Sequence, residues 1–66
     1  MILEINGEKR TLEDGVTIAA LLLALGLDRR GIAIARNDDI VSASEYDHTI
    51  CGSEDRIEII RAVAGG

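Results

Sequence analysis

The sequence predicts an α+β fold, in which one mixed sheet of four to five strands is crossed by one main helix. Residues 56–60 alternate apolar and polar side chains, which is the pattern of a half-buried strand, and residues 2–5 form a short, mostly apolar stretch typical of another strand. Residues 18–25 place aliphatic side chains at helical spacing. The whole chain has 66 residues, which is enough for one small core, so we expect a single domain over residues 1–66.

The N-terminal segment predicts a β-hairpin. Ile2, Leu3 and Ile5 form the first strand, and the Asn6-Gly7 pair after it is a strong signal for a two-residue turn. Residues 9–12 then return as a shorter, more polar strand. Turn chemistry accounts for the Asn-Gly pair, so no active-site role is assigned to it.

A helix follows, capped by Thr17 and stopped by Gly26, a residue suited to a left-handed C-cap. One face of it is aliphatic: Ile18, Leu21, Leu22 and Leu25. The other face carries no charge at all: Ala19, Ala20, Leu23 and Ala24. Because one sheet covers only one side of a helix, we expect the following loop to cover Leu23, with a partner contact as the alternative.

The second half of the chain predicts three more strands. Residues 32–36 and 40–41 are joined by a turn at residues 37–39, a polar stretch with one helical turn covers residues 42–49, and residues 56–60 form the last strand. This order fits a β-grasp arrangement, with the first and last strands adjacent and parallel in the middle. The uncovered sheet face is then a natural docking surface, carrying some of the charged residues Glu4, Lys9, Arg36, Arg56 and Glu58.

Composition excludes several classes of function. The net charge of −5 and the pI near 4.6 argue against nucleic acid or an anionic membrane as partner. The first residues lack the basic and apolar regions of a signal peptide, and the longest apolar run is too short to span a membrane. With these features and one cysteine, a cytoplasmic location is predicted.

No residue inside the chain is a convincing catalyst. Cys51 fits a small buried hydrophobe better than a nucleophile, and His48 lies in a polar, solvated stretch. Asp38 and Asp39 are adjacent, as expected of a turn and not of an acid/base pair. No Cys/His spacing suggests a metal site. We therefore expect a carrier or substrate of other enzymes, and not an enzyme.

The C-terminal stretch, residues 62–66, contains only alanine, valine and glycine. It offers little side-chain burial in return for ordering, so a flexible tail is expected. Gly65 and Gly66 lack Cβ atoms and can be drawn through a channel too narrow for other residues. Such a tail would present the Gly66 carboxylate, and no side chain, to another protein's active site.

The chain resembles the ThiS family, the ubiquitin-like sulfur carriers of thiamine biosynthesis. Three features carry the resemblance: the order of the elements, the segment at residues 34–41 and the ending at residues 62–66. The resemblance covers essentially the whole chain. It implies a β-grasp fold and a cycle at Gly66. A ThiF-like enzyme would use Mg-ATP to adenylate its carboxylate, a persulfide would supply sulfur, and the resulting thiocarboxylate would donate that sulfur to a ThiG-like thiazole synthase.

The tail residues and this resemblance together predict roles along the tail. Gly66 would be the modified residue, Gly65 and Ala64 would thread into the partner, and Val63, Ala62 and Arg61 would form the recognised neck. No catalytic residue, bound cofactor or metal is expected, since ATP and magnesium belong to the partner enzyme.

Three alternatives stay open at this point. A MoaD-like carrier for molybdopterin synthesis shares the fold and the terminal chemistry, and the synthase that accepts the sulfur would separate the two. A ubiquitin-like modifier would form isopeptide bonds through Gly66 and give a ladder of conjugates. A binding module that works through its sheet face would keep its function after deletion of the two terminal glycines.

Overall fold

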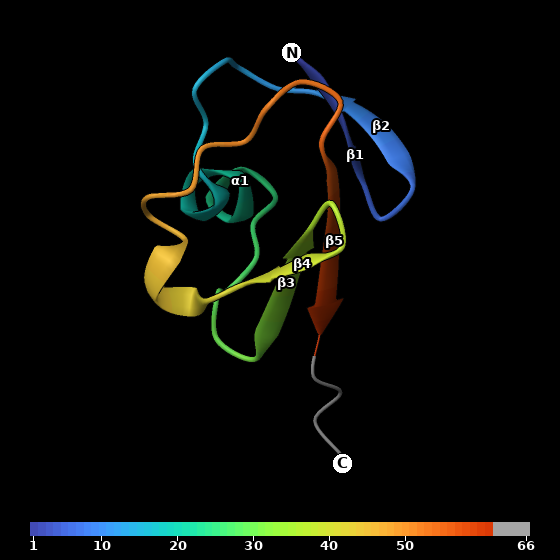
Figure 1. Ribbon diagram of the computed structural model, residues 1–66. Helices are drawn as coiled ribbons and strands as arrows, with labels where there is room; N and C mark the ends of the chain where they lie inside the picture. The colour runs from blue at the N-terminus through green and yellow to red at the C-terminus, as the bar shows by residue number, and fades with distance from the viewer. Residues whose placement is uncertain (62–66) are drawn as a thin grey trace.

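The computed structural model describes residues 1–61, and the tail predicted at residues 62–66 lies outside them. One helix lies across a single sheet, with the N-terminus and the end of the last strand toward opposite ends of the molecule (Figure 1). In chain order the elements are β1 (Ile2–Ile5), β2 (Glu8–Thr11), α1 (Ile18–Ala24), β3 (Ile32–Arg36), β4 (Asp39–Val41), a short 3-10 turn (Ala43–Glu45) and β5 (Arg56–Arg61).

The five strands form one mixed sheet in the order β2-β1-β5-β3-β4. The first and last strands, β1 and β5, are adjacent and parallel, with Ile5 opposite Ile57. All other pairs are antiparallel. This topology confirms the predicted β-grasp fold, and it places β5 in the centre of the sheet.

The strand boundaries shift slightly from the predicted ones because the turns are tighter than expected. Asn6 and Gly7 both adopt positive φ, 51° and 83°, which makes a two-residue turn whose twist matches that of the strands. Pairing therefore resumes at Glu8, opposite Ile5. Asn37 and Asp38 repeat this geometry, with φ of 50° and 73°, and the predicted strand at residues 40–41 begins one residue earlier.

The helix begins and ends as its sequence predicts. The Thr17 hydroxyl accepts a hydrogen bond from the Ala20 N–H at 3.1 Å, which caps the first turn. At the other end Gly26 has φ of 69°, its N–H donates to Leu23 O at 3.0 Å, and the Leu27 N–H donates to Leu22 O at 2.9 Å. This pair of bonds is a Schellman motif, which satisfies the last helical carbonyls.

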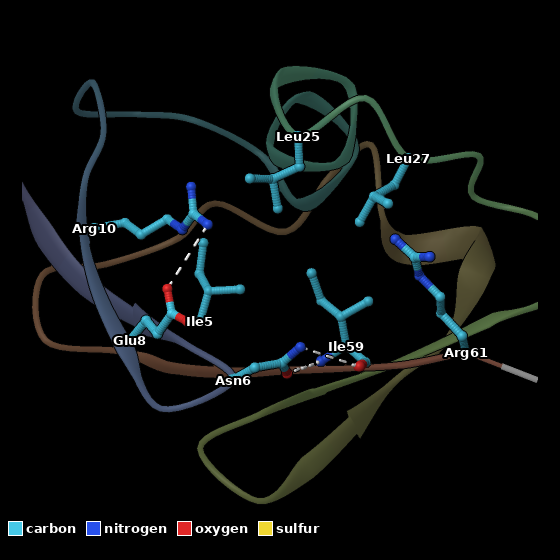
Figure 2. A pocket seen from close by; sticks show the side chains of 8 residues that line it. All are labelled: Ile5, Asn6, Glu8, Arg10, Leu25, Leu27, Ile59 and Arg61. Carbon is cyan, nitrogen blue, oxygen red and sulfur yellow. Dashed lines mark hydrogen bonds and ion pairs between the residues drawn. The ribbon is translucent and has the colours of Figure 1, made fainter.

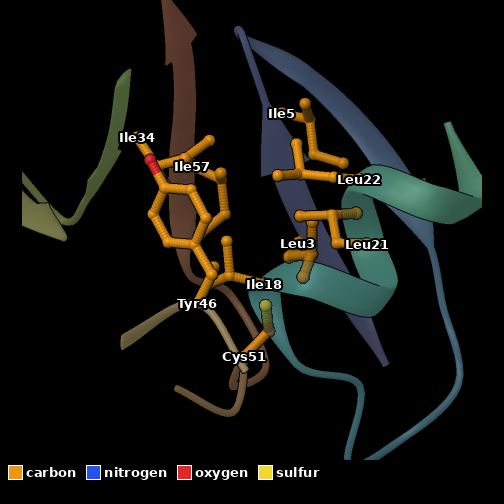
Figure 3. Packing of buried hydrophobic residues seen from close by; sticks show 9 residues of the cluster. All are labelled: Leu3, Ile5, Ile18, Leu21, Leu22, Ile34, Tyr46, Cys51 and Ile57. Carbon is orange, nitrogen blue, oxygen red and sulfur yellow. The ribbon is translucent and has the colours of Figure 1, made fainter. Parts of the chain in front are cut away.

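The core lies between α1 and the inner face of the sheet (Figure 3). The aliphatic helix face packs onto β1, β3 and β5, and Tyr46 and Cys51 close the end of the cluster. Its members are Leu3, Ile5, Ile18, Leu21, Leu22, Ile34, Tyr46, Cys51 and Ile57. The prediction that Cys51 is a small buried hydrophobe is confirmed, since Cys51 is only 3% exposed.

The prediction that a loop covers Leu23 is wrong, because this residue is 79% exposed. The chain after the helix is held elsewhere. Arg29 donates to the Asp47 carboxylate at 3.3 Å and to Ala43 O at 3.1 Å, and its guanidinium lies 5.3 Å from the centre of the Tyr46 ring. These contacts hold the segment after α1 against the 3-10 turn, so that it does not fold over Leu23.

Candidate functional site

Most of the predicted site lies beyond the described residues. Gly66, Gly65, Ala64, Val63 and Ala62 fall outside residues 1–61, so their roles stay predictions. Arg61, the remaining member of the predicted neck, is the last residue of β5 and is exposed. What the structure describes is therefore the base from which residues 62–66 continue.

That base is the central strand of the sheet. β5 pairs with β3 over five residue pairs, from Ile57 opposite Arg36 to Arg61 opposite Ile32. On its other side it pairs in parallel with β1, where the Asn6 N–H donates to Ile57 O at 2.9 Å. β1 holds only the start of β5, whereas β3 pairs with it as far as Arg61, so pairing with β3 sets the position and direction of Arg61.

The Asn6 side chain extends this support beyond the end of β1. Its Oδ1 accepts a hydrogen bond from the Ile59 N–H at 2.8 Å, and its Nδ2 donates to Ile59 O at 3.4 Å (Figure 2). The amide group thus takes the place of one more residue of a parallel neighbour strand. Sequence reasoning missed this role, because the Asn-Gly pair was already explained by the turn.

Substitution of Asn6 tests this support. Asn6→Gly keeps the positive φ and removes only the two side-chain bonds, so we expect a loss of about 1 kcal/mol in the free energy of unfolding. Asn6→Ala also replaces asparagine, which tolerates the left-handed region, with alanine, which does not, and this adds about 1 kcal/mol. Urea denaturation measures both. Equal, negligible losses in the two variants would show that the bonds to Ile59 contribute nothing.

The outer face of the sheet, opposite α1, divides into two regions. At one end Lys9, Glu4 and Arg56 lie side by side across β2, β1 and β5. Toward the C-terminal end of β5, Ile60 lies opposite Ala33 and is 50% exposed. Ile40 of β4, nearby, is 71% exposed. The predicted docking face therefore offers an exposed apolar area close to the base of the tail.

One residue predicted for that face lies elsewhere. Arg36 is opposite Ile57 and so points to the helix side of the sheet, where its Nε donates to the Asp55 carboxylate at 2.8 Å. Asp55 also accepts from Asn37 Nδ2 at 3.0 Å and from the Gly52 N–H at 2.6 Å. The carboxylate thus joins the end of β3 and the turn after it to the loop directly before β5.

The protonation of this group follows from its surroundings. Burial by itself raises the pKa of Asp55, but the hydrogen bonds from Asn37, Gly52 and Arg36 outweigh it and hold the pKa below its usual value. Burial, with the Asp55 carboxylate, raises the pKa of the nearby Cys51 thiol. The thiol is thus protonated at neutral pH, and a nucleophilic role for it is disfavoured.

The remaining polar candidates are solvent-facing, as predicted. His48 is exposed, and Asp38 forms a surface ion pair with Arg56 at 2.9 Å. Within residues 1–61, no group of three His, Cys, Asp or Glu side chains is arranged to hold a metal ion. In the same part of the chain, no helix has the length and apolar character needed to cross a membrane.

The fold matches solved structures over the whole chain. A crystal structure of the thiamine biosynthesis protein ThiS from Geobacter metallireducens superimposes with a TM-score of 0.86 and 23% sequence identity, covering all of both chains. The solution structure of a thiamine biosynthesis protein from the same organism gives a TM-score of 0.81 over 88% of its own length. At this identity the likeness shows a shared fold.

Two curated relatives are closer in sequence. A thiazole synthase from Paramagnetospirillum magneticum is 41% identical over all 66 residues, and one from Magnetococcus marinus is 33% identical over the same length. This chain spans only 20% of each of those proteins.

The model of the ThiS family matches residues 3–66, which include the central strand and the complete predicted tail. The match extends over nearly the whole chain, and the described residues have the β-grasp fold predicted from the resemblance to this family. The chain belongs to the ThiS family.

Proposed function

We propose that this chain is a sulfur carrier of thiamine biosynthesis, and that it carries sulfur on the carbonyl carbon of Gly66. The observation that carries the proposal is the family match through residue 66, on a chain whose last described strand is the centre of the sheet. In this proposal residues 1–66 are one carrier domain, and the chain is a co-substrate of other enzymes.

The proposed cycle begins with activation, because a carboxylate is a poor electrophile. A carboxylate oxygen of Gly66 attacks the α-phosphorus of ATP on a ThiF-like adenylating enzyme, and pyrophosphate leaves. Magnesium and ATP belong to that enzyme, and the carrier contributes the terminal residue. The use of ATP by the adenylating enzyme agrees with the cytoplasmic location predicted for this chain from the sequence.

Sulfur then replaces the adenylate. The terminal sulfur of a protein persulfide attacks the Gly66 carbonyl carbon, and AMP leaves with the electron pair of the broken C–O bond. A second thiol cleaves the resulting acyl disulfide, which leaves the thiocarboxylate on Gly66 and a disulfide on the sulfur donor. The thiocarboxylate next transfers its sulfur to a ThiG-like thiazole synthase.

The choice of thiazole synthase as acceptor has support from the curated relatives. Two proteins named thiazole synthase contain a stretch that is 33–41% identical to this whole chain. A carrier domain within a synthase chain is held near the site where its sulfur is used. We propose that this chain likewise works as the sulfur carrier of a thiazole synthase.

Intact-mass measurement tests the proposal. The protein is incubated with ATP, a ThiF-like enzyme and a persulfide donor, and its mass should rise by the difference between one sulfur and one oxygen atom. A variant lacking Gly66 should show no change. An unchanged wild-type mass, with an enzyme that is active on its own carrier, would overturn the proposal.

The acceptor is tested with the loaded carrier. Thiamine biosynthesis requires that a ThiG-like synthase consume the thiocarboxylate and restore the original mass. Selective transfer to a molybdopterin synthase subunit would instead assign the chain to the MoaD-like alternative. A ladder of covalent conjugates on a denaturing gel would identify a modifier.

A further inference from the structure

A groove of about 490 Å³ lies on the helix side of the sheet, beside the end of β5 (Figure 2). Its apolar lining comes from β1, β5 and the segment directly after α1: Ile5, Ile59, Leu25 and Leu27. Arg10 of β2 and Arg61 of β5 line opposite sides of it. Since residues 62–66 follow Arg61 directly, whatever binds in this groove lies next to the base of the tail.

The groove exists because the helix is too short to cover the whole inner face. Strand β2 is at the sheet edge, and its pairing places Glu8 opposite Ile5 and Arg10 opposite Leu3. Both charged residues therefore occupy inward-facing positions, which in a covered strand would be apolar. α1 ends at Ala24, so these positions border an open groove and not the core.

The two arginines are available to an outside partner. Arg61 forms no ion pair with any of residues 1–61, and Arg10 reaches only Glu8, at 4.0 Å, the limit of an ion pair. Arg30 is different, because Asp28 holds it at 2.7 Å. The charged residues that line the groove are Arg10, Arg61 and Glu8, so the groove has a net positive charge. The chain as a whole has a net charge of −5, so this positive region differs from the rest of the protein.

We propose that this groove binds an acidic segment of the adenylating enzyme, with a carboxylate at Arg10, another at Arg61 and an aliphatic side chain over Leu25 and Leu27. The inference rests on the proposed function, because it assigns a partner to the base of the same tail. An acidic segment complements the arginines, and its binding places that enzyme beside residues 62–66. Opposite charges also accelerate the encounter of two proteins at low ionic strength.

Two neighbouring residues of β2 provide a matched test. Lys9 and Arg10 differ by one position, and Lys9 lies opposite Glu4 on the outer face, away from the groove. Lys9→Glu and Arg10→Glu therefore change the net charge equally on opposite faces of one strand. The measurement is ATP–pyrophosphate exchange by the adenylating enzyme, with KM for the carrier determined at low and high salt.

We expect Arg10→Glu and Arg61→Glu each to raise KM about tenfold at low salt, and Lys9→Glu, on the outer face, to raise it clearly less than Arg10→Glu does. Glu8→Gln, which removes the repulsive carboxylate from the groove, should lower KM. High salt should reduce these differences. An acidic-to-Arg substitution in the enzyme that restores KM for Arg10→Glu would identify the contacting carboxylate.

Equal effects of Lys9→Glu and Arg10→Glu, with normal exchange by the wild type, would overturn the groove assignment and leave the proposed function intact. In that case the inward charges of β2 serve only to discourage pairing of the sheet edge with another chain. Absence of exchange with the wild-type carrier would remove the proposed function, and the groove assignment with it. Circular dichroism of each variant checks that the fold is kept.

Discussion

Asp55→Ala should destabilise the protein by about 3 kcal/mol, since it leaves Arg36, Asn37 and the Gly52 N–H without their shared acceptor. A single core in a domain of this size rarely supplies more than about 3–5 kcal/mol. We therefore expect a marginally stable variant, whose cooperative urea transition is lost or moves to a much lower urea concentration.

A matched pair of substitutions separates burial from charge. Asp55→Asn keeps the shape and one acceptor oxygen but loses the charge, so we expect a loss of about 1–2 kcal/mol. Asp38→Asn makes the same change in the exposed pair with Arg56 and should cost less than about 0.5 kcal/mol. Equal losses at the two positions would contradict a special role for the buried carboxylate.

The Asp55 carboxylate should also make the free energy of unfolding depend on pH. Because the folded pKa of Asp55 lies below its unfolded value, its contribution is present above about pH 4 and is lost as the pH falls through the folded pKa. The side-chain hydrogen bond from Arg30 lowers the pKa of Asp28 to about 2. Asp28 contributes equally to the acid unfolding of the wild type and of Asp55→Asn. The difference between the two acid unfolding curves therefore gives the contribution of Asp55 alone.

Gly65→Val should reduce formation of the Gly66 thiocarboxylate about a hundredfold or more, if the tail passes through a channel that excludes side chains. Gly65→Ala, with a single added carbon, should have a smaller effect in the same direction. The initial rate of mass gain in the assay described above measures both.

The unfolding temperature serves as the control for this series, and we expect no change because the small side chains of residues 62–66 offer little burial in return for ordering. Activity of Gly65→Val equal to that of the wild type would contradict the narrow-channel interpretation. It would leave Gly66 as the modified residue, which is tested separately by its deletion.

Local sequence signals determined the elements and their order. Asn6-Gly7 specified a two-residue hairpin because both residues tolerate positive φ, and Thr17 and Gly26 bounded the helix through hydrogen bonds within a few residues. Alternation identified β5, apolar residues before the Asn-Gly turn identified β1, and the central parallel pair followed from the order of the elements. The resemblance to the ThiS family likewise depended on residues that can be recognised without the fold.

The tertiary structure alone decided the contacts between distant segments. Asn6 bonds to Ile59, which is 53 residues away, and Asp55 bonds to Arg36, 19 residues away. Neither pairing has a local signature, since turn chemistry already explained Asn6 and turn composition explained Asp55.

The surfaces around the tail were decided in the same way. Leu23 is exposed because Arg29 holds the next segment against another loop, and the groove beside Arg61 is open because a short helix leaves the inner side of β2 uncovered. Periodicity shows which face of an element a side chain occupies, but not whether another element covers that face. Coverage depends on the lengths and the placement of all the elements together, and for this protein only the packed fold specifies it.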